Sequence, residues 1–326
     1  MTFQKFWLVM VLLVGGLSIA DRPLQAGTFE YSIQSGGGAR NYIVYTPSSY
    51  TGGKELPLVL FFHGGQGDMN SASTNYGWKE KAEQAGFIVA FPNGASPLPG
   101  GRLATWNAGN CCGYARDSKT DDVRFTQDML ADIKNKFSVD TENIFATGFS
   151  NGGMLSYRLA CDMTGTFRAI AAVAGTDNTL SCSPTRPISV LHIHAVDDDT
   201  VLYNGGAGDK FNDPGQVTPF TSVAETMTRW TARNSSLSAP ERVFSASGAY
   251  CDMYRSGANV SQVKVCVTET GSHSWPGSAP VGNMNPSQAF SANDMIWDFF
   301  ASQANAVIVT PVPAPLPAPA PVPVPV

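Results

Sequence analysis

Short, mostly apolar runs recur along this chain of 326 residues, and they limit its possible folds more than any other feature. Leu56–Phe62, Ala169–Val173 and Ser189–Ala195 are three of these runs. Strands that are apolar along their whole length are typical of parallel sheets, because helices cover both faces of such a sheet. Segments with the spacing of amphipathic helices lie between the runs. The sequence therefore predicts an α/β fold, a mostly parallel doubly wound sheet with helices on both faces.

Hydrophobic periodicity places the expected elements along the chain. Strands are expected at Thr28–Ile33, Tyr42–Thr46, Leu56–Phe62, Phe87–Phe91, Ile144–Thr147, Ala169–Val173, Ser189–Ala195 and Val263–Thr268. Helices are expected at Asp122–Phe137, Gly152–Asp162, Val223–Asn234 and Ser291–Gln303. Three consecutive glycines, Gly36 to Gly38, predict a hairpin turn between the first two strands.

The N-terminal segment, residues 1–26, has the layout of a secretory signal peptide. Lys5 precedes an uncharged apolar run, Phe6–Ile19, and the small residues Ala20 and Ala26 are suited to cleavage by signal peptidase. The run is shorter than the roughly 20 residues that a membrane-spanning helix needs, and an uncleaved anchor is the alternative. A secreted protein, extracellular or periplasmic, is therefore expected.

Proline occupies every second position from Pro311 to Val326. A segment of this kind adopts extended polyproline II and has no core to bury. We therefore expect a disordered, proline-rich tail at residues 306–326. About 280 residues remain between the signal and the tail, which is enough for a single α/β domain at residues 27–305.

The charge of the chain restricts its partners. Its formal net charge is −5 and its isoelectric point is near 5.3, so it has no excess of basic residues. Binding to a phosphate backbone requires a basic stripe, so neither nucleic acid nor another polyanion is expected as a partner. No membrane partner is expected beyond the export step.

Six cysteines in an exported chain fit disulfides better than metal or redox chemistry, and no C-x-x-C motif occurs. The local candidates are the pairs Cys161–Cys182 and Cys251–Cys266. The adjacent Cys111 and Cys112 are then either a vicinal pair or partners of other cysteines. Six cysteines allow many connectivities, so this pairing is a hypothesis.

Gly148 to Gly152 have the pattern G-x-S-x-G, and they lie between an expected strand and an expected helix. In this pattern a sharp turn holds the central serine in strained backbone geometry, and small residues two positions away avoid clashes. A purely structural turn is the alternative, because the bare pattern is common. The flanking strand and helix favour Ser150 as a nucleophile.

A serine is a poor nucleophile until a base removes its proton, and the chain has four histidines to supply that base. In doubly wound hydrolases the order along the chain is serine, acid, histidine, because the base lies in the loop after the last strand. His273, in a polar loop after Val263–Thr268, fits this order. His192 and His194 share one face of a strand, but no third ligand at suitable spacing accompanies them. They are therefore interpreted as structural residues or as supports for the catalytic side chains, and no metal site is expected.

Three consecutive aspartates, Asp197 to Asp199, follow the expected strand Ser189–Ala195. One of them is expected to orient the imidazole of the base. Asp198 is preferred, because it lies four residues after His194 and three before Val201. This spacing suits a loop that folds back toward the sheet. Asp197 is the alternative acid, and a solvated acidic turn accounts for the remaining aspartates.

An ester or amide hydrolase also needs two backbone N–H groups aimed at the developing oxyanion. One normally belongs to the residue after the nucleophile, here Asn151. The other comes from a loop after an early strand, and the glycine-rich turn from His63 to Gly67 is in that place. Gly65 or Gln66 is the expected second donor.

Several motifs appear together in a fixed order. They are Trp106 to Gly113, Asp121 to Val123, Gly148 to Gly153, Arg158 to Cys161, His192 to His194, Asp198, Tyr203 to Gly206 and His273 to Gly277. This set resembles the extracellular polyhydroxybutyrate depolymerase and feruloyl esterase group, carbohydrate esterase family 1 of the α/β-hydrolase superfamily. The chain departs from that pattern at Ala195 and Val196, where Gly and Thr are usual, and at Asp199, where Pro is frequent.

The resemblance implies an α/β-hydrolase fold and a triad of Ser150, Asp198 and His273 that cleaves carboxylic esters without a cofactor. The implied substrates are poly- or oligo-3-hydroxybutyrate, or feruloyl and acetyl esters of plant polysaccharide. Trp106, Trp275 and Tyr203 are aromatic candidates for binding the substrate, and burial in the core is the alternative for the tryptophans.

Two other functions remain open. A serine peptidase on the same fold is possible, because the same triad serves both acyl groups. A non-catalytic, exported polymer-binding protein is the second alternative, although all the residues expected for catalysis are present.

Overall fold

The computed structural model describes residues 25–206, 208, 219–236, 239–256, 261–280 and 285–304. The strands are β1 (Gly27–Ser35), β2 (Gly38–Thr46), β3 (Leu56–Phe62), β4 (Ile88–Pro92), β5 (Val139–Phe149), β6 (Ala169–Val173), β7 (Ser189–Ala195), β8 (Glu241–Ala246), β9 (Ala249–Arg255) and β10 (Gln262–Thr268). The helices are α1 (Met69–Asn75), α2 (Trp78–Ala85), a 3₁₀ turn η1 (Pro99–Gly101), α3 (Gly113–Asp117), α4 (Asp122–Lys136), α5 (Asn151–Asp162), α6 (Val223–Arg233) and α7 (Ala292–Ala304).

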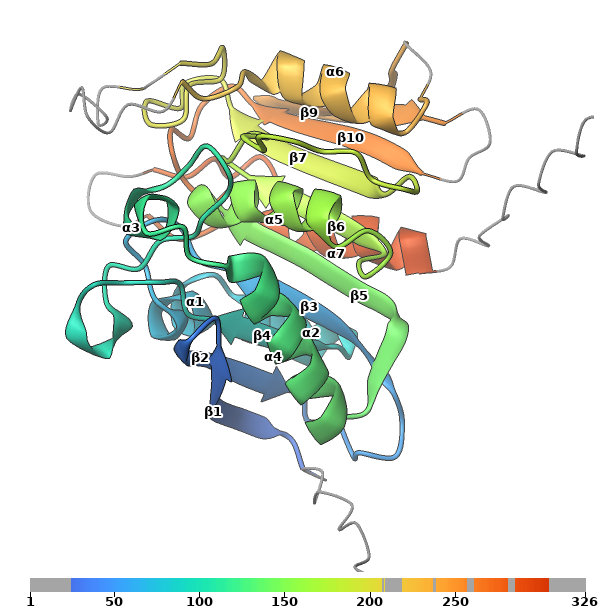
Figure 1. Cartoon of the computed structure of the whole chain (residues 1–326). Coiled ribbons are helices and arrows are strands. Elements are labelled where there is room, and N and C mark those ends of the chain that lie inside the picture. Colours follow the sequence, from blue (N-terminus) through green and yellow to red (C-terminus); the bar gives the residue numbers. More distant parts are fainter. Residues whose placement is uncertain are drawn as a thin grey trace, which may run out of the picture.

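The strands form one sheet within the described residues, in the order β1-β2-β4-β3-β5-β6-β7-β10-β9-β8 (Figure 1). The strands from β4 to β10 in that order are parallel, and antiparallel strands complete both edges. The predicted mostly parallel sheet is therefore confirmed. The hairpin expected at the three glycines joins β1 to β2, with Gly36 and Gly37 at φ values of 60° and 86° that favour glycine.

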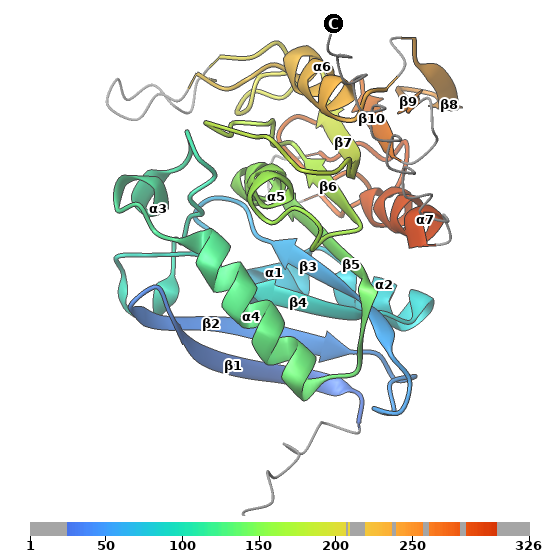
Figure 2. The same ribbon diagram turned by 45° about the vertical axis from the view of Figure 1, so that its right-hand side comes forward.

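Helices cover both faces of the sheet, as Figure 2 shows for α4, α5 and α6 on one side and α2 and α7 on the other. Alternate residues of a central strand pack into the two layers. In β3, Leu58, Leu60 and Phe62 belong to the cluster under α4, α5 and α6. Val59 and Phe61 belong to the cluster under α1, α2 and α7. Burial on both faces explains why this strand is apolar along its length.

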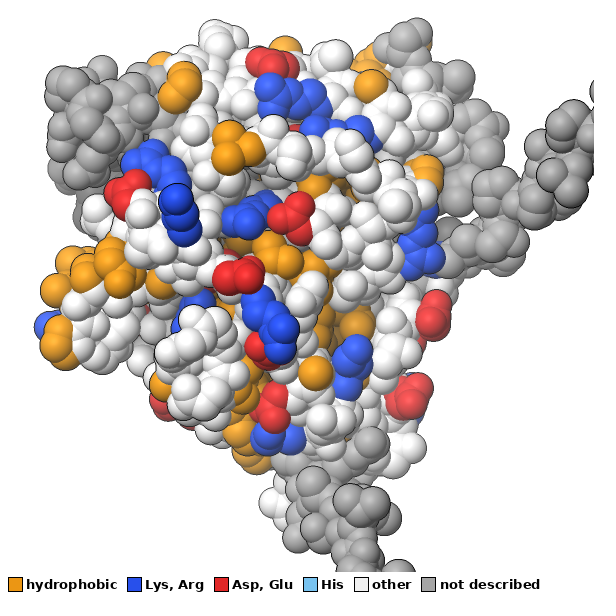
Figure 3. Space-filling view, viewed as in Figure 1, with side chains coloured by type: hydrophobic (Ala, Val, Ile, Leu, Met, Phe, Trp, Pro, Cys, Tyr) orange, Lys and Arg blue, Asp and Glu red, His pale blue; other side chains and the backbone are white. Residues whose placement is uncertain are grey.

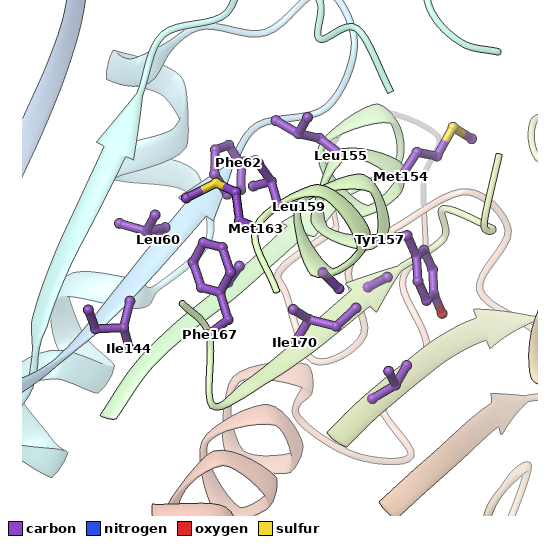
Figure 4. Close-up of a cluster of buried hydrophobic side chains, with 14 of the residues drawn as sticks. Leu60, Phe62, Ile144, Met154, Leu155, Tyr157, Leu159, Met163, Phe167 and Ile170 are labelled. Atoms are coloured by element: carbon purple, nitrogen blue, oxygen red, sulfur yellow. The ribbon is translucent and has the colours of Figure 1, made fainter. Parts of the chain in front are cut away.

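The contact between α5 and the sheet is drawn in Figure 4. Leu155 and Leu159 of α5 lie in the same buried cluster as Phe62 of β3 and Ile170 of β6. Burying one such side chain contributes roughly 1.5–3 kcal/mol, so several together hold the helix firmly. This packing fixes the start of α5, and with it the position of the turn that contains Ser150.

On the outer face of α4 and α5, charged side chains pair with residues of opposite charge and do not cluster with residues of like charge. Figure 3 shows Lys and Arg interspersed with Asp and Glu on this face. The i,i+4 ion pairs on these helices are Arg124–Asp128, Lys136–Asp132 and Arg158–Asp162. Exposed pairs of this kind contribute little to stability because water and salt screen them, so the buried clusters dominate the stability of the fold.

Several elements were not predicted. The edge strand β8 is exposed along nearly its whole length, so it has no apolar run, and its partner β9 was missed with it. The short helices α1, α2 and α3 have too few turns to give a clear period. The strand β5 begins at Val139, earlier than the predicted Ile144.

The cysteines pair as Cys161–Cys182, Cys251–Cys266 and Cys111–Cys112. The first two pairs are those predicted from local spacing, and the third is the vicinal pair that the sequence left as one of two possibilities. The second pair links residues directly opposite each other on β9 and β10. It therefore fastens the antiparallel strand β9, which carries the edge strand β8, to the parallel part of the sheet.

The expected signal run and the proline-rich segment lie outside the described residues. None of the helices within the described residues has the length and apolar character needed to cross a bilayer.

Candidate active site

Ser150 occupies a sharp turn between β5 and α5. Its φ and ψ, 51° and −121°, lie outside the regions that residues other than glycine usually adopt. A Cβ atom on Gly152 would lie 2.1 Å from the carbonyl oxygen of Phe62, and one on Gly148 would lie 2.5 Å from the backbone of Gly152. Close packing of the turn therefore requires both glycines. Such backbone strain costs about 1–3 kcal/mol and occurs mainly at functional sites.

Three side chains far apart in sequence form one hydrogen-bonded series. Nε2 of His273 lies 2.9 Å from Oγ of Ser150, and Nδ1 of the same ring lies 2.8 Å from Oδ2 of Asp198. The three residues follow the parallel strands β5, β7 and β10, so the sheet brings them together at one edge. The Asp198 side chain is fully buried, whereas that of His273 is 12% exposed, which leaves the imidazole accessible to a bound molecule.

Both oxygens of Asp198 are hydrogen-bonded. Oδ1 accepts the N–H groups of Thr200 and Val201, at 2.9 and 2.8 Å. Oδ2 accepts from His273 and lies 3.3 Å from Nε2 of His194. Burial by itself raises the pKa of Asp198, but the hydrogen bonds from the two histidines outweigh it and hold that pKa well below its usual range. The carboxylate is therefore ionised at neutral pH.

Asp197, the alternative acid, has a different position. Its carboxylate accepts the backbone N–H groups of Gly271 and Ser272, at 3.2 and 2.8 Å. These residues immediately precede His273, so Asp197 holds the loop that carries the imidazole rather than the imidazole itself. Asp199 accepts the hydroxyl of Thr200 at 2.9 Å. Of the three aspartates, the structure places only Asp198 at the His273 ring.

Two backbone segments adjoin Ser150, the start of α5 and the glycine-rich turn after β3. The N–H of Gln66 donates to the carbonyl of Ala104 at 2.8 Å, so Gln66 does not offer the oxyanion donor that the sequence suggested. In the part of the chain that the structure describes, the N–H groups of Gly65 and Asn151 donate to no protein group. A Cβ on Gly65 would lie 3.6 Å from that of Asn151, so these two donors are neighbours.

The side chain of Asn151 has a role that the sequence did not reveal. Its Oδ1 accepts the N–H of Trp106 at 2.7 Å, and its Nδ2 donates to the carbonyl of the same residue at 3.0 Å. The indole of Trp106 donates to the carbonyl of His63 at 2.9 Å and is fully buried. Trp106 is therefore a core residue that joins the segment after β4 to the turn that carries Ser150. It is not exposed to bind a substrate, as the resemblance suggested.

His63 has a structural role. Its Nε2 accepts the N–H of Gly94 at 3.0 Å, and its Nδ1 donates to the carbonyl of Gly64 at 2.7 Å. Burial lowers the pKa of His63 to about 4. The neutral ring therefore ties the glycine-rich turn to the end of β4.

A cavity of about 350 Å³ opens beside Ser150. Its apolar lining includes Phe149, Met154, Val201 and Phe220. Polar residues are also present, among them Thr105 and Arg116, and Nε of Arg116 pairs with Asp117 at 2.8 Å. None of these lining residues was a sequence candidate. Phe149 and Met154 flank Ser150, and the others come from segments that are distant in sequence.

A second hollow of about 180 Å³ lies on the other side of His273 and Phe149, both of which line the two cavities. Tyr76 and Trp275 supply further aromatic surface there. Trp275 is thus at the site, although only 4% of its surface is exposed. Tyr203 lines neither cavity. Its ring stands edge-on to that of His194, with 6.0 Å between the ring centroids, so its position does not support a role in binding the substrate.

Within the described residues, no three His, Cys, Asp or Glu side chains are grouped in a way that would hold a metal ion.

Comparison with known proteins identifies the family of this chain. Residues 33–273 match the Esterase family model, described as "Putative esterase". Feruloyl esterase B of Piromyces equi is 30% identical over 242 residues, which are 72% of this chain and 42% of that protein. A bifunctional acetylxylan esterase/xylanase of Neocallimastix patriciarum is 27% identical over 58% of this chain and 26% of its own length.

Feruloyl esterase C of Emericella nidulans is 29% identical over 51% of this chain and 58% of its own length. The chain thus spans less than two thirds of the length of each of these curated relatives.

Solved structures share the fold. An acetyl xylan esterase from Aspergillus awamori aligns over 84% of this chain and 99% of its own, with a TM-score of 0.56 and 16% identity. An S-formylglutathione hydrolase from Agrobacterium tumefaciens aligns over 87% of this chain and 96% of its own, with a TM-score of 0.52 and 11% identity. The chain therefore belongs to the Esterase family and has the α/β-hydrolase fold.

Proposed function

We propose that this protein is a serine esterase that hydrolyses carboxylic esters through an acyl-enzyme. The observation that carries the proposal is the hydrogen-bonded series of Ser150, His273 and Asp198 beside an apolar cavity. The feruloyl and acetylxylan esterases among its relatives support ester hydrolysis as the reaction.

In this mechanism Nε2 of His273 removes the proton of Ser150 as Oγ attacks the ester carbonyl. The oxygen of the tetrahedral intermediate accepts hydrogen bonds from the N–H groups of Asn151 and Gly65. The imidazolium then gives its proton to the departing alcohol, and water repeats the sequence to release the acid. Asp198, which is buried and ionised, holds Nδ1–H of His273 and stabilises the positive ring.

The cavity beside Ser150 suits an aromatic acyl group. Its volume of about 350 Å³ is far larger than an acetyl group needs, and Phe149, Met154 and Phe220 offer an apolar lining for a flat ring. Arg116 and Thr105 supply hydrogen-bond donors at the same cavity for ring substituents. We therefore propose a hydroxycinnamoyl ester such as a ferulate as the preferred substrate.

The smaller hollow suits the alcohol side of the ester. It shares His273, whose proton goes to the leaving alcohol, but it contains neither Ser150 nor the oxyanion donors. Aromatic side chains next to hydroxyls, here Tyr76 and Trp275 beside Ser274, are suited to a sugar ring with its apolar faces and polar edge. This arrangement favours an ester of a sugar over a polyester.

The test is turnover of methyl ferulate, 4-nitrophenyl acetate and a 3-hydroxybutyrate oligomer side by side, with Ser150→Ala as the control. We expect the highest kcat/KM with the ferulate and no turnover by the variant. Preference for the oligomer would reject the plant-polysaccharide substrate but keep the esterase. Cleavage of peptide amides in preference to all three esters would show a peptidase instead.

A fluorophosphonate probe separates the enzyme from a non-catalytic binding protein. We expect it to label the wild-type protein and not Ser150→Ala. Absence of labelling in both would leave polymer binding as the better explanation.

We also propose that the protein is exported. The signal-like segment at residues 1–26 is the support for this, with the catalytic domain at residues 27–305 and the proline-rich tail at residues 306–326. N-terminal sequencing of the secreted protein tests the cleavage site, and retention of all the protein inside the cell would reject export.

A further inference from the structure

A chain of buried hydrogen bonds runs from α5 through β7 to Asp198. The Tyr157 hydroxyl lies 2.9 Å from Nδ1 of His192, and Nε2 of His192 lies 3.0 Å from Nδ1 of His194. Nε2 of His194 lies 2.7 Å from the carbonyl oxygen of Val201 and 3.3 Å from Oδ2 of Asp198. Figure 4 shows Tyr157 projecting from α5 toward the sheet. The tyrosine and both histidines are at most 1% exposed.

The partners at the Asp198 end determine where each proton lies. A carbonyl and a carboxylate only accept hydrogen bonds, so Nε2 of His194 carries the hydrogen. In a neutral His194 the bare Nδ1 then accepts Nε2–H of His192, and the bare Nδ1 of His192 accepts the hydroxyl of Tyr157. Burial lowers the pKa of His192 well below its ordinary value, so that ring is neutral. With neutral rings, only one direction of donation satisfies every group in the chain.

We propose that His194 is a positioning residue for the acid Asp198, and that Tyr157 and His192 lock His194 in the tautomer that donates to Oδ2. This inference rests on the proposed esterase function.

The contacts of the carboxylate explain what His194 adds. Thr200 and Val201 fix Oδ1, but Oδ2 is the oxygen that must face His273. The N–H of His194 approaches that same oxygen and so limits rotation of the carboxylate. A neutral ring does this without placing a second positive charge beside the imidazolium that forms on His273 during the reaction.

Other charged and titratable groups lie near this series of hydrogen bonds. At its far end, burial raises the pKa of Tyr157, Asp177 raises it further and Arg233 lowers it, and these two charged residues pair with each other at 2.6 Å. At the near end the ring of Tyr203 stands edge-on to His194. The charges that face the histidines directly are therefore those of Asp198 and, when protonated, His273.

The first experiment compares three variants by kcat and KM per active site, counted by fluorophosphonate titration. His194→Leu removes the donor, and His194→Gln offers an amide N–H close to the position of Nε2. Asn234→Leu is the matched control, since it removes a buried side chain that bonds Ile188 at the other end of β7.

We expect kcat of His194→Leu to fall by about 10- to 100-fold with little change in KM, because a hydrogen bond to a charged group is lost. His194→Gln should recover most of kcat, and the control should keep kcat even if it is less stable. An unchanged kcat per active site in His194→Leu, or an equal loss in the control, would overturn the proposal.

A second measurement needs no variant. In the wild-type protein with ¹⁵N-labelled histidine, NMR should show His194 and His192 as neutral rings protonated at Nε2. A His194 protonated at Nδ1, or at both nitrogens, would overturn the proposal even if His194→Leu did not fold. If the wild type hydrolysed no ester and the probe did not label it, the proposed function would fail, while the spectrum would still report the tautomer.

Discussion

Replacing Asp198 by asparagine tests the assignment of the acid most sharply. Oδ1 of Asp198 accepts two backbone N–H groups, so the amide oxygen of the asparagine must take that position. The amide NH₂ then faces His273 and donates to its Nδ1. The ring is forced to carry its proton on Nε2, where it points at Ser150 and cannot accept the serine proton.

This wrong tautomer sets the size of the effect. In serine hydrolases the corresponding change lowers kcat by about 10⁴-fold, which is roughly 5 kcal/mol of barrier. Asp197→Asn is the matched control, because among the described residues its carboxylate accepts hydrogen bonds only from the backbone N–H groups of Gly271 and Ser272. Losing one such charged hydrogen bond costs about 1.5–3 kcal/mol, and most of that loss falls on the stability of the loop.

Initial rates with 4-nitrophenyl acetate near neutral pH measure both variants, and thermal unfolding by circular dichroism establishes that each is folded. We expect Asp198→Asn to be folded and nearly inactive, and Asp197→Asn to retain much more activity. The reasoning is refuted if folded Asp198→Asn keeps more than about a tenth of wild-type kcat, or if Asp197→Asn loses as much.

Three further outcomes are expected. Burial in the folded protein lowers the pKa of His63 from 6.5 to about 4. The neutral ring therefore contributes to the free energy of unfolding above pH 6.5, and about 3 kcal/mol of this contribution is lost as the pH falls toward 4. Urea unfolding should show this decrease between pH 6.5 and 4 in the wild type, and a smaller decrease in His63→Asn. Gly152→Ala, whose Cβ would meet the Phe62 carbonyl at 2.1 Å, should abolish probe labelling, whereas Gly38→Ala, with no atom within 4 Å, should not. Replacing Cys251 and Cys266 together by alanine should lower stability by about 3 kcal/mol, since the bridge closes a loop with a sequence separation of 15; an unchanged unfolding midpoint in the oxidised double variant would contradict this.

Features encoded within short segments could be predicted from the sequence alone. The strands β3, β6 and β7 have the predicted bounds, because burial on both faces demands a continuous apolar run that ends where the chain leaves the sheet. The strand, turn and helix around Ser150 are likewise contiguous, so the G-x-S-x-G pattern located the turn. The exposed strand β8 has no comparable run and was missed.

Features that depend on how loops fold back were decided only by the tertiary structure. Asp197 and Asp198 are adjacent in the same turn, and the spacing in sequence favoured Asp198 but left Asp197 as the alternative. The structure directs one carboxylate to a ring and the other to the backbone of the same loop. It also engages the N–H of Gln66 with the carbonyl of Ala104, so that Gly65 is the oxyanion donor that we propose. Each outcome depends on a partner that is distant in sequence, and the local pattern does not record which atoms the fold brings within hydrogen-bonding distance.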